Sequence, residues 1–296
     1  MSFSHTAKSE ICRAMTDSKR RFACLYGIFM FCKYFGEKEI KFRTGCPASS
    51  ELFESLMKEF FSKEFEVAFD KQKSGEKVSY THTISDTSAV FEKFNIDHKR
   101  DKLNIDLAMK NGLDAFFSGV FLACGSVSNP RKEYHFEFAV YNDALKSELL
   151  AMTENFCGVS LRESSRRKLN VLYAKDSESV EELLTMVGAT KSAMDVMLIK
   201  IDKNDNNYVN RITNCDSANI DKIVSASQKQ TDAIKKIIKH GALDTLSSDL
   251  REIALLRIDN PEMSLRELGE ALEKPIGRSG VNHRMNRLIE IAKDLE

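Results

Sequence analysis

Hydrophobic and polar positions follow two patterns along the chain, one typical of helices and the other of strands. Apolar residues at helical spacing predict a helix over residues 18–35, and an alternating stretch after it predicts a strand over 39–44. Four further elements are predicted next: a helix over 50–62, an extended segment over 64–69, a strand over 77–84 and a helix over 87–94. This part of the chain therefore has the order α-β-α-β-β-α.

The same order of elements returns in the next part of the chain. Its predicted elements are a helix over 113–124, a strand over 134–141, a helix over 143–156, strands over 159–163 and 168–174, and a helix over 177–187. Equivalent positions such as Gly27 and Gly119 recur at a nearly constant spacing of about 92 residues. The sequence therefore predicts an α+β domain over residues 1–190, built from repeats at about 18–95 and 112–188.

Each repeat begins with a strongly apolar helix that carries a glycine. The two segments are LYGIFMFCK (Leu25–Lys33) and FSGVFLACG (Phe117–Gly125), and both are apolar on nearly all sides, as buried helices are. A glycine inside a helix costs about 1 kcal/mol relative to alanine, so Gly27 and Gly119 need a packing reason. We expect that these glycines let the two helices approach each other closely.

These paired segments resemble the motif of the LAGLIDADG homing endonucleases. The resemblance implies two helices packed along a pseudo-twofold axis and two four-stranded sheets that form a saddle for DNA. In catalytically active members, the eighth motif residue is an acid that binds Mg²⁺. Here that position is Cys32 in the first copy and Cys124 in the second, and the flanking Lys33 and Gly125 offer no replacement. We therefore predict no catalytic residues, no metal site and no enzymatic activity.

Basic residues on the predicted saddle are candidates for a second DNA contact. Lys41 and Arg43 are two residues apart and share one strand face, whereas their counterparts in the second repeat, His135 and Glu137, are not basic. A further basic group lies at a serine-containing turn of the second repeat: Arg166, Arg167 and Lys168. Solvated hairpins explain such groups more often than binding sites do.

The last part of the chain has a different organisation. Residues 191–215 are polar and predict an irregular linker, and residues 216–296 predict an all-α domain. Ser264 followed by Glu267 is a capping box, which marks the start of a helix. A short helix, a tight turn and a longer helix are the order of a helix-turn-helix DNA-binding motif. The expected helices are 218–240, 244–259, 264–272 and 279–295.

The final helix has one apolar and one polar side. Its apolar residues recur at steps of three and four, which predicts the buried side: Val281, Met285, Leu288 and Ala292. On the opposite side, His283 and Arg287 point away from that stripe, and the residues beside them are of the kind that read base edges or contact phosphates. The candidate DNA contacts are Arg278, Ser279, Asn282, His283, Arg284 and Arg287.

Composition restricts the remaining possibilities. The chain of 296 residues has 44 Lys and Arg against 44 Asp and Glu, so a DNA-binding surface must be a local patch. The longest apolar run is shorter than the roughly 20 residues of a membrane span, and no signal-peptide pattern is present. We therefore expect a cytoplasmic protein without a membrane partner, nucleoid-associated when bound. Seven Cys and six His residues show no ligand spacing, which predicts neither metal nor cofactor.

The segment SLRELGEALEKPIGRSGVNHRMNRLIEIA (Ser264–Ala292) strongly resembles the C-terminal signature of the WhiA family of bacterial transcription regulators. Asn210–Ala218, the opening Met1–Ile11 and the overall length match that family too, so the resemblance covers nearly the whole chain. It implies a degenerate homing-endonuclease-like domain joined to a helix-turn-helix domain that binds double-stranded promoter DNA. It also implies a role in cell division, chromosome segregation or sporulation. The first motif helix departs from the pattern at Phe31 and Lys33, where small residues are usual.

Three functions remain after these observations. A sequence-specific DNA-binding transcriptional regulator without nuclease activity is the leading hypothesis. An interaction protein that binds another protein through its N-terminal domain is the main alternative, and the two roles are compatible. A divergent homing endonuclease is the least favoured function, because the motif acids are absent.

Overall fold

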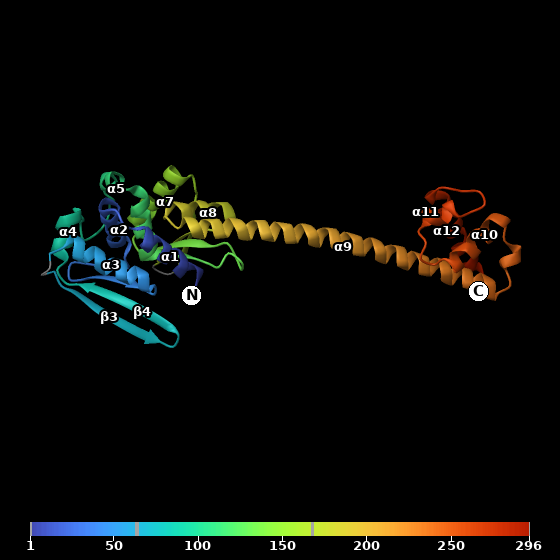
Figure 1. Cartoon of the computed structure of the whole chain (residues 1–296), viewed down its shortest axis with the longest axis horizontal. Coiled ribbons are helices and arrows are strands. Elements are labelled where there is room, and N and C mark those ends of the chain that lie inside the picture. Colours follow the sequence, from blue (N-terminus) through green and yellow to red (C-terminus); the bar gives the residue numbers. More distant parts are fainter. Residues whose placement is uncertain (1, 63–64, 167–168, 296) are drawn as a thin grey trace. The chain divides into compact units, whose positions relative to one another are not determined.

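The computed structural model describes residues 2–62, 65–166 and 169–295. The chain divides into two compact units, Met1–Lys203 and Asn204–Glu296. A helix of 50 residues, α9 (Thr190–Lys239), contributes residues to both units (Figure 1). In the described part of the chain, no helix combines the length and the apolar character that crossing a membrane requires.

The first half of the N-terminal unit forms an antiparallel four-stranded sheet with the strand order β1-β2-β4-β3. The helix α3 contacts this sheet next to the long hairpin of β3 and β4 (Figure 1). The elements of this half are α1 (Phe3–Ala14), α2 (Ser18–Phe31), β1 (Tyr34–Phe35), β2 (Ile40–Thr44), α3 (Pro47–Phe60), β3 (Val67–Ser74), β4 (Lys77–Ile84) and α4 (Thr87–Phe94).

The second half repeats this architecture after a short helix, α5 (Ile105–Asn111). Its antiparallel sheet has the strand order β5-β6-β8-β7, which is the order of the first sheet. The elements of this half are α6 (Leu113–Cys124), β5 (Gly125–Val127), β6 (Phe136–Val140), α7 (Asp143–Cys157), β7 (Arg162–Arg166), β8 (Leu169–Ala174) and α8 (Ser177–Met186). The predicted duplicated α+β fold is therefore confirmed.

Helices α2 and α6 meet at their glycines. A Cβ atom on Gly27 would lie 2.4 Å from the carbonyl oxygen of Phe116, and one on Gly119 would lie 2.0 Å from the carbonyl oxygen of Cys24. Both distances are far inside van der Waals contact, so the two backbones leave no space for any side chain at these positions. Around this contact every residue of α2 from Ala23 to Phe31 and every residue of α6 from Ala115 to Leu122 is buried, as the apolar pattern predicts.

The C-terminal unit is helical throughout its regular elements. After α9 come a 3₁₀ turn η1 (Leu243–Thr245), α10 (Ser248–Asp259), α11 (Leu265–Glu270) and α12 (Arg278–Asp294). One core holds these helices together, and it combines residues of all four α-helices: Ile234, Ile237, Ile253, Ala254, Leu268, Leu272, Val281, Met285, Leu288 and Ala292. The predicted all-α domain is confirmed by this arrangement.

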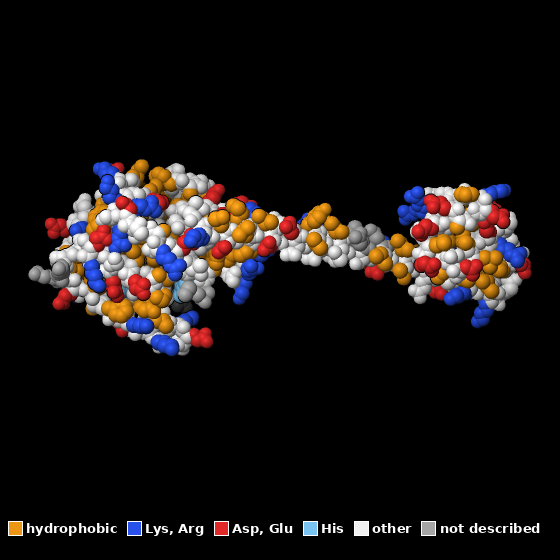
Figure 2. All heavy atoms as spheres, in the orientation of Figure 1, with side chains coloured by type: hydrophobic (Ala, Val, Ile, Leu, Met, Phe, Trp, Pro, Cys, Tyr) orange, Lys and Arg blue, Asp and Glu red, His pale blue; other side chains and the backbone are white. Residues whose placement is uncertain are grey.

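Several sequence-based expectations about element boundaries were wrong. The strand predicted over 159–163 is observed at Arg162–Arg166, so the serines that were expected to form a turn lie inside it. The helix predicted over 18–35 ends at Phe31, and the separate strand β1 follows it. Residues 191–215 were expected to be irregular, yet they belong to α9. Met194, Met197, Leu198 and Ile201 have helical spacing but remain on the surface, and exposed apolar atoms are visible along this helix in Figure 2. The many polar side chains in this segment suggested an irregular linker. They are equally compatible with a solvent-exposed helix, because a helix satisfies its backbone hydrogen bonds internally.

Candidate nucleic-acid interface

The short helix α11 is fixed at its start by a capping box. The hydroxyl of Ser264 accepts a hydrogen bond from the backbone N–H of Glu267 (3.3 Å), and the Glu267 carboxylate accepts one from the backbone N–H of Ser264 (2.7 Å). The second bond holds the pKa of Glu267 below its ordinary value. The predicted capping box is therefore confirmed, and it satisfies two donors that the helix itself leaves unpaired.

The turn between α11 and α12 depends on Gly269. The N–H of Ile276 donates to the carbonyl oxygen of Gly269 (3.1 Å). A Cβ on Gly269 would lie 2.2 Å from the carbonyl oxygen of Ile276 and 3.0 Å from a methyl group of Val281. Sequence reasoning missed this glycine, because it lies inside the helix before the turn. Its close approach lets α12 begin directly against α11.

Helix α12 has the two sides that its sequence predicts. All four stripe residues are buried: Val281, Met285, Leu288 and Ala292. The opposite side is exposed and carries Ser279, Asn282, His283, Asn286 and Arg287. Arg278 is the first residue of the helix and is also exposed. The structure thus brings the candidate DNA contacts together on one helix, with only Arg284 partly buried.

The two arginines in the middle of α12 have different partners. Arg284 donates to a carboxylate oxygen of Asp249 on α10 (2.9 Å), and only 21% of its side chain is exposed. Arg287 pairs with Glu290 on its own helix (3.1 Å), and 60% of its side chain is exposed. Exposed ion pairs contribute at most about 1 kcal/mol, so Arg287 can exchange Glu290 for another partner at small cost. Figure 2 shows basic and acidic side chains interspersed on this unit.

A buried arginine positions the segment that precedes α11. Arg257 is 2% exposed and donates through Nη1 to the carbonyl oxygens of Met263 (2.6 Å) and Pro261 (3.3 Å). The hydroxyl of Ser227 also donates to the Pro261 carbonyl. These bonds tie α9 and α10 to the loop that carries the capping box. The sequence pattern gave no sign of this role for Arg257.

A basic pocket lies beside the start of α12, within the C-terminal unit. Its volume is about 440 Å³. Three cationic side chains on its wall are exposed: Lys222, Arg266 and Arg278. Asn282 of α12 also lines it. Of these residues, sequence reasoning singled out only Arg278 and Asn282. Cations grouped next to a polar helix face suit the phosphates that flank a base contact.

The two described candidate contacts on the N-terminal sheets each have a neighbouring partner. Lys41 forms an ion pair with Glu39 (2.6 Å), and Arg43 donates to the hydroxyl of Ser79 (2.7 Å). In the second half, His135 and Glu137 contact each other (3.1 Å). The predicted match of these two residues to Lys41 and Arg43 was wrong: Phe138 takes the place of Phe42, so the counterparts are Glu137 and Ala139. Of the basic turn, Arg167 and Lys168 lie outside the described residues, as does the side chain of Arg166. Among the N-terminal candidates, the structure therefore describes the side chains of Lys41 and Arg43 alone, and these two lie beside Glu39 and Ser79.

Cations lie at the ends of both central helices in the N-terminal unit. Arg100 is 8% exposed, and its Nη1 donates to the carbonyl oxygens of Phe29 (3.1 Å), Met30 (2.7 Å) and Cys32 (2.9 Å) at the end of α2. Lys8 donates to the carbonyl oxygen of Leu122 near the end of α6 (3.3 Å). A positive charge is favourable at a helix C-terminus, where carbonyl groups lack intrahelical partners. Neither cation was foreseen from the sequence.

The two motif cysteines are neutral in this surrounding. Burial raises the pKa of the Cys32 thiol to about 11 and that of Cys124 to about 12. Mg²⁺ prefers oxygen ligands, above all carboxylates, and neutral thiols do not replace them. The described residues contain no group of three His, Cys, Asp or Glu side chains placed to hold a metal ion. The carbonyl groups at the ends of α2 and α6 thus bind basic side chains of the protein, and no carboxylates are present at the two motif positions to bind a metal ion.

Together these features define the class of protein: an α+β unit with the LAGLIDADG-like duplicated fold, followed by an all-α unit with a helix-turn-helix motif. The family model described as the WhiA LAGLIDADG-like domain matches residues 113–206, and that of the WhiA C-terminal HTH domain matches residues 209–292. The chain belongs to the WhiA family of proteins.

Full-length relatives and a solved structure agree with this assignment. The chain is 35% identical to the "Probable cell division protein WhiA" of Clostridium acetobutylicum and 33% identical to that of Clostridium perfringens strain SM101. Both similarities cover 100% of this chain and 98% of the relative. The crystal structure of full-length DUF199/WhiA from Thermatoga maritima shares the fold, with a TM-score of 0.59, 24% identity and 99% of each chain covered.

Proposed function

We propose that this protein is a sequence-specific DNA-binding transcriptional regulator, acting at promoter regions in cell division, chromosome segregation or sporulation. The exposed polar side of α12 is the observation that carries the proposal, because it follows a capped helix and a glycine-dependent turn. Two relatives are called probable cell division proteins, which supports the biological part. Such a regulator acts in the cytoplasm and is nucleoid-associated when bound.

Within this proposal the residues of α12 make two kinds of contact with DNA. Ser279, Asn282, His283 and Arg287 lie on the exposed side and read base edges in the major groove. Arg278 and Arg284 contact phosphates, together with the cations of the neighbouring pocket. Arg284 gives up its ion pair with Asp249, or shares it, when DNA is bound.

The same proposal excludes nuclease activity. At the ends of α2 and α6, the carboxylates needed to hold divalent cations are replaced by neutral thiols. Arg100 adds positive charge at the end of α2, and Lys8 places an amine at the end of α6, where burial lowers its pKa. A nearby positive charge disfavours a bound Mg²⁺. The helix pair therefore retains the LAGLIDADG-like fold but does not support metal-dependent DNA cleavage.

A protein partner is the second candidate role of the N-terminal unit. It is favoured over a second DNA contact because the second half has Glu137 where the first half has Lys41, so the two sheets do not present matching basic faces. Lys41→Ala combined with Arg43→Ala should then leave DNA affinity almost unchanged. A clear loss of affinity would instead assign DNA binding to this sheet.

The experiment that tests the main proposal is footprinting of a genomic fragment library with the purified full-length protein. Discrete protected sites are expected, and the Asn282→Ala, His283→Ala double variant should lose them. A matched control, Lys235→Ala with Lys239→Ala, changes two exposed residues of α9 and should protect the same sites. Uniform protection of all fragments, or none, would overturn the proposal of sequence-specific binding.

A further inference from the structure

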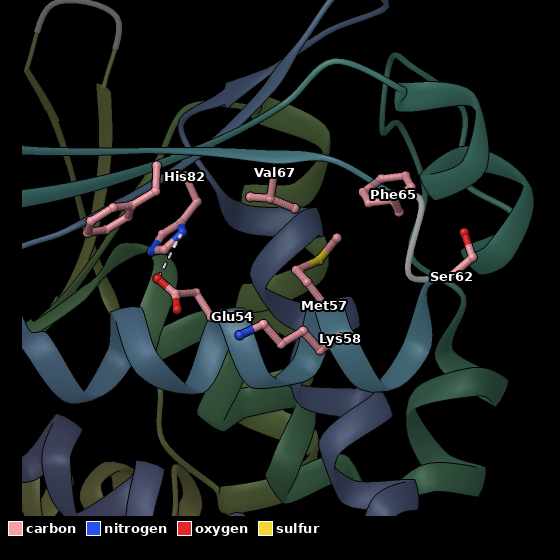
Figure 3. A pocket seen from close by; sticks show the side chains of 8 residues that line it. Glu54, Met57, Lys58, Ser62, Phe65, Val67 and His82 are labelled. Carbon is pink, nitrogen blue, oxygen red and sulfur yellow. Dashed lines mark ion pairs between the residues drawn. The ribbon is translucent and has the colours of Figure 1, made fainter.

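A cavity of about 700 Å³ lies in the first half of the N-terminal unit, between α3 and the β3–β4 hairpin (Figure 3). Its walls are largely apolar and include Met57, Val67 and Phe69. Three groups that can carry charge share the same cavity: Glu54, Lys58 and His82. We propose that this cavity is a binding site for an uncharged aromatic alcohol, whose hydroxyl group is recognised by His82 and Glu54.

His82 is the most informative group on the wall. It is fully buried, and its Nε2 lies 2.7 Å from the hydroxyl of Ser50. Its Nδ1 has no hydrogen-bond partner among the described residues, and the nearest carboxylate oxygen, on Glu54, lies 4.0 Å away. Figure 3 shows the ring and the Glu54 carboxylate facing each other at one end of the cavity. A buried nitrogen without a partner is unusual and needs an explanation.

The protonation of His82 follows from its neighbours. Burial lowers its pKa, so the ring is neutral near pH 7 and carries one proton. A lone pair on Nδ1 would face the negative charge of Glu54, whereas an N–H group there is attracted to it. The proton therefore lies on Nδ1, and the Ser50 hydroxyl donates to Nε2. The cavity thus ends in an N–H donor and a carboxylate acceptor that are too far apart to bond each other.

The second half of the unit shows that the fold does not require these polar groups. His82 lies opposite Phe42 in the middle of β2, and the residue opposite Phe138 in the middle of β6 is Leu172. Glu54 occupies the position in α3 that Leu150 occupies in α7, counted from the first residue of each helix. Two leucines thus stand where the first half has a histidine and a glutamate. A role specific to the first half explains the difference.

The cavity's chemistry selects the ligand class. Phe69 is half exposed, and its ring centroid lies 5.1 Å from that of His82. An aromatic ring of a ligand can therefore pack against these two rings. Glu54 and Lys58 carry opposite charges, which favours an uncharged guest. One hydroxyl group both accepts from the Nδ1–H and donates to the carboxylate. The Glu54 side chain is 41% exposed, so it can move outward by the distance that the hydroxyl oxygen needs.

The proposal is tested with 4-propylphenol and with propylbenzene, which lacks only the hydroxyl. Full-length protein with isotope-labelled histidine is titrated with each probe, and the ring signals of His82 are followed by NMR. We expect saturable shifts, with the phenol bound at least about tenfold more tightly than the hydrocarbon. No saturable shift up to the solubility limit of the probes, or equal affinity for both, would overturn the proposal.

Variants separate recognition of the hydroxyl from simple partitioning into an apolar space. His82→Leu reproduces the residue of the second half and should abolish the preference for the phenol, measured by saturation-transfer NMR. Val67→Phe should weaken both probes by filling the cavity, while Val209→Phe, on an exposed part of α9, should change neither. If His82→Leu does not fold, Glu54→Leu provides the same comparison. An unchanged preference in the folded variant contradicts the assigned recognition.

Discussion

The ends of α2 and α6 and the exposed side of α12 both carry cations on architectures associated with DNA, but they use those cations differently. Arg100 is 8% exposed, and its Nη1 donates hydrogen bonds to three backbone carbonyls. Arg287 is 60% exposed, and its partner Glu290 is equally accessible. The first cation holds a helix end together, and the second is available to a ligand.

The difference teaches that burial and hydrogen bonding decide what an arginine does. Removing a buried guanidinium leaves its acceptors without partners, which costs stability. An exposed guanidinium exchanges one anion for another at little cost, so it can bind phosphate or a base edge. The net charge of the chain is zero and therefore carries no information about either role.

The largest effect is expected where the two central helices touch. Gly119→Ala places a Cβ atom 2.0 Å from the Cys24 carbonyl oxygen and forces α2 and α6 apart. We expect the free energy of unfolding of the N-terminal unit to fall by roughly 4 kcal/mol or more, measured by urea denaturation. Gly36→Ala is the matched control, because the nearest atom to its new Cβ lies at 3.9 Å. Equal stability of the two variants would contradict the close contact between α2 and α6.

The next effect tests the buried cation directly. Arg100→Met keeps an unbranched side chain but leaves the carbonyls at the end of α2 without their donor. The free energy of unfolding should fall by about 3 kcal/mol, whereas DNA affinity of the folded protein should stay unchanged. Arg20→Met, which removes an exposed ion pair with Asp114, should cost at most about 1 kcal/mol. A loss of DNA affinity without a loss of stability would show that Arg100 binds DNA.

Local patterns were sufficient to predict much of the fold. The predicted bounds of α6 and β4 coincide with the observed Leu113–Cys124 and Lys77–Ile84, because each has a strong pattern and clear end signals. The strand β1 has two residues and forms only through pairing with β2, so no local pattern reveals it. In α9, Met194, Met197 and Leu198 did carry a helical spacing, and the polar residues around them hid it.

The candidate site was predictable only where it lies on one regular helix. The α12 stripe from Val281 to Ala292 follows from helical periodicity, and the polar side follows from the stripe. Arg257 and Arg100 act through carbonyls of other segments, and such contacts leave no local signal. The ion pair that partly buries Arg284 joins it to Asp249 on α10, far away in the sequence. Contacts between segments that are distant in the sequence can be identified only once the tertiary structure is known.

A moderate effect is expected for the exposed arginine of α12. Arg287→Ala should weaken binding to the preferred site by about 1–3 kcal/mol and change binding to random DNA little, because a base-edge contact carries the discrimination. Titrations of specific and scrambled duplexes at two or more salt concentrations measure this. If specific binding is unchanged in the folded variant, α12 does not read the bases, and the N-terminal sheets become the leading candidate.

Arg284 provides the contrast within the same helix. Arg284→Ala should weaken specific and scrambled duplexes alike and lower the salt slope by about one, as the loss of a phosphate contact does. Asp249→Asn, which removes the acidic partner, should strengthen both slightly. A selective loss on the preferred site after Arg284→Ala would instead place this arginine among the base-reading residues.

The smallest effect is expected for DNA cleavage by the protein in the presence of divalent cations. The purified protein should leave supercoiled and linear DNA intact in Mg²⁺ or Mn²⁺, because the helix ends hold thiols and cations instead of carboxylates. A double variant, Cys32→Asp with Cys124→Asp, restores acids at both motif positions but keeps Arg100 and Lys8. We expect no cleavage from it either, since each new carboxylate pairs with the adjacent cation before it can hold a metal ion. Cleavage by the double variant alone would show that the missing acids were the single barrier and that the cations serve only the helix ends. Glu37 is an acidic residue that follows α2 closely in the sequence. Site-specific cleavage by the unaltered protein that survives purification and is lost in Glu37→Ala would contradict the comparison itself, because the buried cations would then lie at a working catalytic centre.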